Sequence, residues 1–300
     1  MSVPSPSCPL CAAASSLAFT TSDLNRRATD EEFRYCGCHG CGVIFLENVP
    51  GDLQRYYTSG YHRTPDASQL DQASAPQAYK LEFVRPHVAA GSIVDIGPSY
   101  GAFLHVARRA GYDVTAIEMN AACCAFIEEV IGARAVHSSE PQAALMSLPQ
   151  VDVITLWHSI EHLTEPWLTL EAAAARLRPG GLLVVSTPNP VGIQARLLKG
   201  IWTHVDAPRH LFLIPSLALL DRASMYGLSS VLTTSSDEET LRCNRFGWQR
   251  ALFELGLRHA GDRIGPSMAQ VLGTAMERVV RPLESHGDRA SAYVAVLAKS

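Results

Sequence analysis

Cysteines near the start of the chain have the spacing of a metal site. Five of the eight cysteines in this 300-residue chain lie within its first 41 residues. Cys8 and Cys11 form one CxxC pair, Cys38 and Cys41 form a second, and Cys36 lies close by. Four thiolates at this spacing can surround one tetrahedral zinc ion. Because four protein ligands leave no open coordination position, we expect a structural zinc that stabilises a ribbon too short to fold on a core of its own.

A second group of reactive side chains follows an apolar run at 151–157. His158, Glu161 and His162 are spaced i, i+3 and i+4, so on a helical turn they share one face. A later loop, HVDAPRHLF, supplies further polar groups that could cover the same region: His204, Asp206, Arg209 and His210.

The histidines and Glu161 admit three interpretations. One histidine could be the general base that removes a proton from an acceptor hydroxyl, which typically contributes roughly 10²–10⁴-fold in rate. Alternatively, a divalent metal held by His158, Glu161, His162 and His210 could acidify that hydroxyl. Glu161 and His162 could also do no more than form a hydrogen-bonded helix start.

A glycine turn in the segment SIVDIGPSYGAFL connects an apolar run to a helical pattern. Such a turn presents backbone N–H groups to a ligand at the edge of an α/β sheet. Asp95 would repel a pyrophosphate, yet it suits a ligand with an ammonium group. Glu118 stands 17 residues beyond Gly101, at the end of the next apolar run, where an acid can accept both hydroxyls of a ribose. An aminoacyl group and a nucleoside together describe S-adenosylmethionine.

The elements that must position these groups alternate between short apolar runs and helical patterns from Gly91 onward, which indicates a parallel α/β sheet. The segment 236–290 departs from this alternation and is predicted to form two amphipathic helices, acting as a lid or an interface. In the second helix, the apolar residues share one face: Met268, Val271, Leu272, Met276, Val279 and Val280. The predicted domains are a zinc ribbon at 1–50, a linker and leading helix at 51–85, a cofactor-binding core at 86–235, the helical insertion at 236–290 and a final strand at 291–300.

The ordered motifs VDIGPSYG, VITLWHSIEHL, LRPGG and STPN resemble those of the class I S-adenosylmethionine-dependent methyltransferases. The resemblance implies a Rossmann-like seven-stranded sheet with an antiparallel last strand, although Ser99 stands where the family commonly has glycine. The N-terminal ribbon looks like that of a subset of these enzymes. The implied cofactor site consists of Asp95, Gly97, Tyr100, Gly101, Glu118, Met119 and Trp157.

The glutamate and histidine set is similar to that of the metal-dependent small-RNA 2′-O-methyltransferases and the ubiquinone-pathway O-methyltransferases. In the RNA enzymes, however, a glutamate stands where this chain has His158. The resemblance therefore implies methyl transfer but leaves the choice between a histidine base and a second metal open.

Charge disfavours nucleic acid as a partner. The chain has a net charge of −4, and residues 1–50 carry three arginines against five acidic residues, the wrong sign for binding phosphates. The chain has no export signal and no apolar segment long enough to span a bilayer, so we expect a cytoplasmic protein without integral membrane association.

These features predict an enzyme that methylates an oxygen of a small metabolite or of a glycan or lipid precursor. The alternatives are an RNA methyltransferase with a metal-assisted site and a non-catalytic adaptor that binds protein partners. The sequence indicates neither the acceptor molecule nor the oligomeric state.

Overall fold

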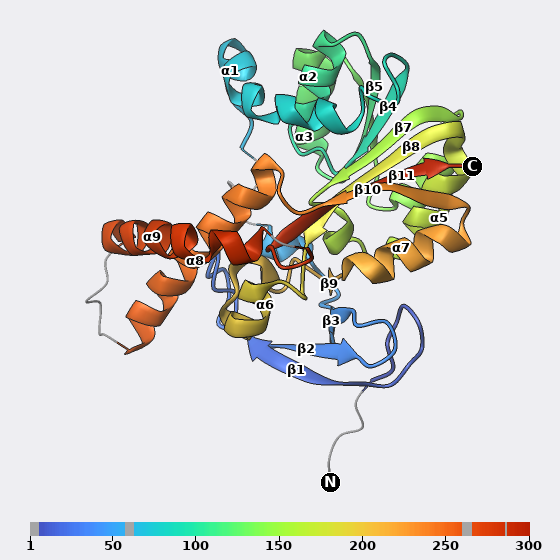
Figure 1. The fold of residues 1–300 in the computed structure, drawn as a ribbon. Coiled ribbons are helices and arrows are strands. Elements are labelled where there is room, and N and C mark those ends of the chain that lie inside the picture. The colour runs from blue at the N-terminus through green and yellow to red at the C-terminus, as the bar shows by residue number, and fades with distance from the viewer. Residues whose placement is uncertain (1–5, 58–62, 260–265, 286) are drawn as a thin grey trace.

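A computed structural model describes residues 6–57, 63–259, 266–285 and 287–300. Its largest element is a seven-stranded sheet in the order β10-β11-β8-β7-β4-β5-β6 (Figure 1). The strands are β4 (Ser92–Ile96), β5 (Asp113–Glu118), β6 (Arg134–His137), β7 (Val151–Trp157), β8 (Leu177–Pro188), β10 (Leu228–Thr234) and β11 (Ala292–Lys299). Strands β4 to β8 are parallel, and β11 lies antiparallel to both β8 and β10. The predicted seven-stranded Rossmann-like sheet with an antiparallel last strand is confirmed.

The central strands are apolar because both faces of the sheet are covered. Along β8, Leu182 and Val184 pack with α2 (Ala102–Arg109) in one core cluster. Their neighbours Leu183 and Val185 point to the opposite face and pack with α4 (Pro141–Met146), α5 (Pro166–Arg176) and α7 (Ser216–Met225). Successive residues point to opposite faces, and both faces are covered. The strand is therefore a continuous hydrophobic run in sequence, without the alternation of apolar and polar residues seen when one face is exposed.

Three further helices are short. They are α1 (Leu70–Ser74), α3 (Ala121–Phe126), which continues into a π-turn at Ile127–Ile131, and α6 (Ile193–Leu198). Segments of 3-10 helix lie at Gln54–Tyr56, Ala67–Gln69, Ala75–Phe83, Ile160–His162, Lys199–Ile201 and Thr203–Val205.

The N-terminal ribbon is a four-stranded sheet, and one of its strands comes from the methyltransferase core. Strands β1 (Ser15–Thr21), β2 (Phe33–Cys38) and β3 (Ile44–Leu46) follow one another in antiparallel order. The fourth is β9 (Phe212–Leu213), which pairs antiparallel with β3 directly after His210. The ribbon is therefore joined by backbone hydrogen bonds to the loop that carries one of the predicted site histidines.

The predicted helical insertion consists of α8 (Glu238–His259) and α9 (Pro266–Glu284), and it precedes the last strand β11. The two helices pack against each other and project away from the large sheet (Figure 1). Gly273 allows their close approach, since a Cβ there would lie 2.5 Å from Gln249 Cα. The apolar face predicted from residue spacing is largely exposed, and Val271 and Val279 are 69% and 75% exposed. Small and acidic residues form the buried face instead: Ala269, Gly273, Glu277 and Glu284.

Within the described ranges, no helix has both the length and the apolar character needed to cross a membrane.

Candidate active site

A cavity of about 600 Å³ opens at the carboxyl ends of β4, β5 and β7. Parallel sheets bind ligands at this edge because the strands end there in loops and helix N-termini. The predicted cofactor residues that line this cavity are Asp95, Gly97, Tyr100, Glu118, Met119 and Trp157. Gly101 lies in the glycine turn next to these residues but does not itself line the cavity.

The glycine turn adopts backbone angles that side chains disfavour. Gly97 has φ +70°, and a Cβ there would stand 2.8 Å from Ser159 Cβ. Gly101 has φ +83°, and its Cβ would stand 2.7 Å from Ile131 Cδ1. Ser99 has φ +56°, a left-handed conformation in which glycine is strain-free. This explains why glycine is common at that position in the family that the sequence resembles.

Asp95 is the penultimate residue of β4 and is buried. Its carboxylate is buried and accepts a hydrogen bond of 2.7 Å from Thr155 Oγ1. Burial raises the pKa of Asp95 to about 7, although the Thr155 hydrogen bond and the nearby Lys80 charge act in the opposite direction. Near neutral pH this carboxyl group is therefore only partly ionised, and a cation in the cavity would favour the anion.

Lys80 is a cavity residue that the sequence reasoning missed. It lies in the 3-10 segment Ala75–Phe83, its side chain is buried, and its Nζ stands 4.7 Å from the centroid of the Trp157 ring. Burial lowers the pKa of Lys80 to about 8, while the charge of Asp95 raises it. The sequence contained one indication that Lys80 is buried: it stands between Tyr79 and Leu81, whose large apolar side chains are both buried.

Glu118 ends β5 and is anchored by the backbone. One carboxylate oxygen accepts a hydrogen bond from the N–H of Ser99 at 2.9 Å, and the other accepts one from Asn120 at 2.8 Å. Burial raises its pKa, and these N–H groups oppose that rise. Because each carboxylate oxygen can accept more than one hydrogen bond, Glu118 can still bind hydroxyl groups of a ligand in the cavity.

His158 and Glu161 form a pair at the end of β7. His158 has φ +51°, lines the cavity, and places Nδ1 3.5 Å from Glu161 Oε1. Burial would lower the pKa of His158, but its interaction with Glu161 raises it. Glu161 is fully buried and accepts a hydrogen bond of 2.9 Å from Thr187 Oγ1. Burial alone would raise the pKa of Glu161, yet His158 and the other nearby histidines hold it at about 2.

His162 and His210 lie next to this pair with their ring centroids 4.5 Å apart. His162 Nδ1 lies 3.0 Å from the backbone oxygen of Arg209, and His210 Nδ1 lies 2.8 Å from that of His204. A carbonyl oxygen only accepts, so each Nδ1 carries the proton and each Nε2 has a lone pair. Burial lowers the pKa of His162 to about 4, and the neighbouring His210 adds to this effect.

The four predicted catalytic residues therefore lie together, but only two reach the cavity. His158 and His162 line it, whereas Glu161 and His210 stand behind them. Ligand atoms of Glu161, His162 and His210 lie within 4.8 Å of one another. A second group that the sequence reasoning missed joins His158 to Glu239 and Cys243 of α8 within the same limit.

The four predicted zinc ligands are also close together. Cys8, Cys11, Cys38 and Cys41 place their sulfur atoms within 4.8 Å of one another. The Cys38 sulfur accepts hydrogen bonds from the backbone N–H groups of Gly40 and Cys41, at 3.3 and 3.4 Å. Cys36 is buried in the ribbon core and is absent from this four-cysteine group. The arrangement is compatible with the predicted zinc ribbon.

Solved structures identify the class of fold. An S-adenosylmethionine-dependent methyltransferase from Archaeoglobus fulgidus superposes with a TM-score of 0.52 at 15% sequence identity, over 78% of this chain and 100% of that one. At this identity the likeness shows the fold, which is that of the class I methyltransferases.

The sequence comparison then identifies the family. Residues 60–233 match the family described as a methyltransferase domain, and the chain belongs to that family. The domain is that of an S-adenosylmethionine-dependent methyltransferase.

Curated relatives are ubiquinone biosynthesis O-methyltransferases. The one from Methylococcus capsulatus is 22% identical over 153 residues, which are 46% of this chain and 62% of the relative. The one from Aeromonas salmonicida is 30% identical over 109 residues, which are 32% of this chain and 43% of the relative. The chain thus spans less than two thirds of the length of these relatives.

Proposed function

We propose that this protein transfers the methyl group of S-adenosylmethionine to a hydroxyl oxygen of a small metabolite or of a glycan or lipid precursor. The observation that carries the proposal is the His158–Glu161 pair, in which His158 lines the cavity beside the glycine turn and Glu161 lies behind it. A neutral hydroxyl is a weak nucleophile, and a base next to the methyl donor is the group that oxygen methylation requires.

The cavity has the donors and acceptors that S-adenosylmethionine needs. Asp95 would take the ammonium group of the methionine part, Lys80 its carboxylate, and Glu118 the ribose hydroxyls. Trp157 Nε1 and Ser159 Oγ are buried at the cavity and make no hydrogen bond within the described part of the chain. Such polar atoms are expected where a ligand completes the hydrogen bonding. When bound, the cofactor supplies an activated methyl group on a sulfonium sulfur.

His158 then acts as the general base. Its imidazole accepts the proton of the acceptor hydroxyl while the oxygen forms its bond to the methyl carbon and the carbon–sulfur bond breaks. Glu161 remains ionised because its pKa is about 2, so it orients His158 and stabilises the imidazolium that forms. Holding oxygen and methyl carbon in line supplies much of the remaining rate enhancement.

The relatives support oxygen as the acceptor atom. The matched proteins are named as O-methyltransferases, and His158 in the cavity wall is a base suited to a hydroxyl. RNA is a weaker candidate because the ribbon carries more acidic than basic residues.

A metal-assisted reaction is the second candidate. Glu161 Oε1 is buried and forms no hydrogen bond among the described residues, and one ring nitrogen each of His162 and His210 lies within 4.8 Å of a Glu161 carboxylate oxygen. A hard or borderline divalent ion held by these three groups would lower the pKa of a bound hydroxyl.

We also propose a structural zinc at the four ribbon cysteines, where it would fix two turns of the ribbon.

The experiment compares His158→Ala and His210→Ala with His39→Ala, an exposed ribbon histidine that serves as the control. Formation of S-adenosylhomocysteine is measured with a panel of phenols and sugar alcohols, and binding of S-adenosylhomocysteine by calorimetry. His158→Ala should lower turnover roughly 10²–10⁴-fold with nearly unchanged cofactor affinity, and His210→Ala should also lower turnover. Wild-type turnover in both variants would refute the assignment, while a second metal that native mass spectrometry detects in the wild type and misses in His210→Ala would favour the metal-assisted route.

A further inference from the structure

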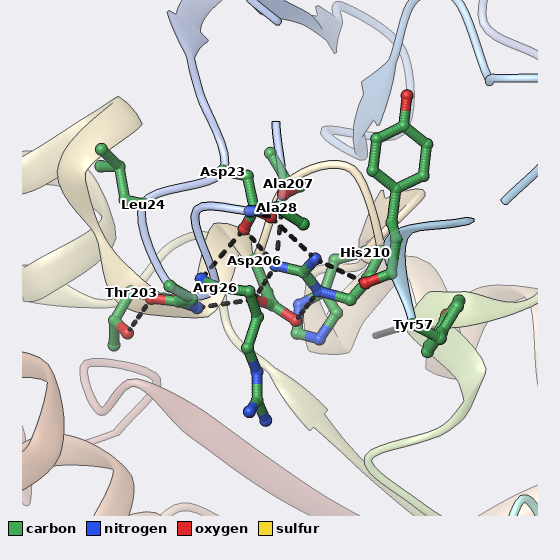
Figure 2. Close-up of polar contacts among 12 residues, drawn as sticks. Asp23, Leu24, Arg26, Ala28, Tyr57, Thr203, Asp206, Ala207 and His210 are labelled. Atoms are coloured by element: carbon green, nitrogen blue, oxygen red, sulfur yellow. Dashed lines mark hydrogen bonds and ion pairs between the residues drawn. The ribbon is translucent and has the colours of Figure 1, made fainter. Parts of the chain in front are cut away.

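The ribbon and the active site share one buried ion cluster. The Arg209 guanidinium is fully buried, and its Nη1 donates to Asp23 of the ribbon at 3.2 Å and to the backbone oxygen of Tyr56 at 3.2 Å. Its Nε donates to Asp206 at 2.9 Å. One side chain thus connects the ribbon, the segment that leaves the ribbon, and the loop 203–211. Figure 2 shows Asp23 and Asp206 within this network, with Tyr57 and His210 beside it.

The loop is held at the residues next to the catalytic histidines. Tyr35, on β2 of the ribbon, donates a hydrogen bond of 2.8 Å to the backbone oxygen of His210. The adjacent carbonyl, that of Arg209, accepts from His162 Nδ1 at 3.0 Å. Movement of this stretch of backbone would therefore release the hydrogen bond that fixes the tautomer of His162.

The segment that follows the ribbon also reaches the cavity. Residues 51–54 and Tyr57 line it, and the Tyr57 hydroxyl lies 3.2 Å from His162 Nδ1. Asn25, in the ribbon, donates to the backbone oxygen of Thr203 and to Asp206, both at 2.7 Å. The ribbon therefore contacts the loop 203–211, and the segment that follows the ribbon forms part of the cavity wall.

We infer that the ribbon is a working part of the acceptor site, in which Asp23 and Tyr35 are positioning residues for His162 and His210. The inference rests on the proposed function, since it assumes that His162, which lines the cavity, faces the acceptor. Through the Arg209 and His210 backbone, the ribbon keeps Nδ1 of His162 protonated and directs its Nε2 lone pair to the reacting side. Buried ion pairs suit this task because water cannot replace their hydrogen bonds.

The test uses two conservative variants of the full chain, Tyr35→Phe and Asp23→Asn. The control is Tyr112→Phe. The hydroxyl of Tyr112, a buried residue, also donates to a backbone carbonyl, that of Val88 at 2.6 Å, but Tyr112 belongs neither to the ribbon nor to the cavity lining. Nitrogen-15 spectra of the histidine rings report the tautomers of His162 and His210. S-adenosylhomocysteine binding and its formation with the hydroxyl panel complete the set.

In the wild type and in Tyr112→Phe, we expect His162 to show one tautomer, with the proton on Nδ1. In Tyr35→Phe and Asp23→Asn, the Nδ1 and Nε2 shifts should converge as the tautomers mix. Turnover should fall about 10- to 100-fold, the loss that a misplacement on the order of 1 Å produces, while the dissociation constant of S-adenosylhomocysteine changes less than about threefold.

Unchanged histidine spectra in both ribbon variants would overturn the inference, whatever the turnover. A parallel loss of cofactor affinity would also overturn it, because it would indicate general destabilisation. If no hydroxyl acceptor is methylated by the wild type, the proposed function fails, but the spectra still show whether the ribbon positions His162. Tyr35→Phe removes a single oxygen atom, so it decides the question if Asp23→Asn does not fold.

Discussion

Asp95 is expected to weaken the fold of the cofactor-free protein. Its carboxyl is buried, and its pKa rises from 3.8 to about 7 on folding. A difference of that size corresponds to about 4 kcal/mol of free energy. The folded pKa lies above the unfolded one, so Asp95 does not reduce the free energy of unfolding below about pH 4, where it is protonated in both states. The free energy of unfolding then falls as the pH rises to about 7.

The substitution Asp95→Asn separates this effect from the rest of the structure. An asparagine stays neutral at every pH, and its Oδ1 can still accept the hydrogen bond from Thr155 Oγ1. Between pH 5 and pH 7 the wild type should lose about 1.4 kcal/mol per pH unit relative to the variant, or about 3 kcal/mol in all.

The assay is urea unfolding of both proteins without cofactor at pH 5 and pH 8. The advantage of Asp95→Asn in unfolding free energy should increase by about 3 kcal/mol between these two conditions, while its affinity for S-adenosylhomocysteine falls. A difference in stability that does not change with pH, or a variant less stable than the wild type at pH 8, would refute the reasoning.

Three further predictions test other parts of the molecule. Cys38→Ser should lose bound zinc and several kcal/mol of stability, whereas Cys36→Ser should keep the zinc. Metal analysis and thermal unfolding distinguish the two variants. The reverse result would mean that Cys36, and not Cys38, is a zinc ligand. Gly97→Ala should lower stability by roughly 2–5 kcal/mol, from backbone strain and from overlap with Ser159. Gly227→Ala, with φ +74° and nothing within 4 Å of the added Cβ, should show the strain alone, so equal losses would rule out the overlap. Turnover should rise with pH through a His158 pKa above the ordinary 6.5, and Glu161→Gln should move that rise to lower pH; an unmoved pH profile would exclude His158 as the base.

The sheet was predictable because its strands are continuous apolar runs separated by helical patterns. The apolar run predicted at 151–157, for example, is a strand with those same bounds. The cofactor residues were predictable for a related reason, since Asp95, Gly97 and Glu118 stand where parallel strands end.

Long-range pairing was not predictable from local patterns. Strand β9 is two residues long, and only the fold brings Phe212 beside Phe45 of the ribbon. The sequence placed Arg209 only in a loop that could cover the site, yet Arg209 is buried because Asp23, from 186 residues earlier, supplies its counter-charge. The apolar face of α9 is exposed because small residues such as Gly273, rather than large ones, let this helix approach α8.

The most direct test of the account is calorimetric titration of the purified protein with S-adenosylhomocysteine, in parallel with the variant Glu118→Ala. The account predicts one binding site per chain in the wild type and a loss of affinity of at least tenfold in the variant, because Glu118 lines the cavity and is expected to hold the ribose hydroxyls. Absence of binding to the wild type, or equal affinity in the two proteins, would contradict the assignment of this cavity to the cofactor.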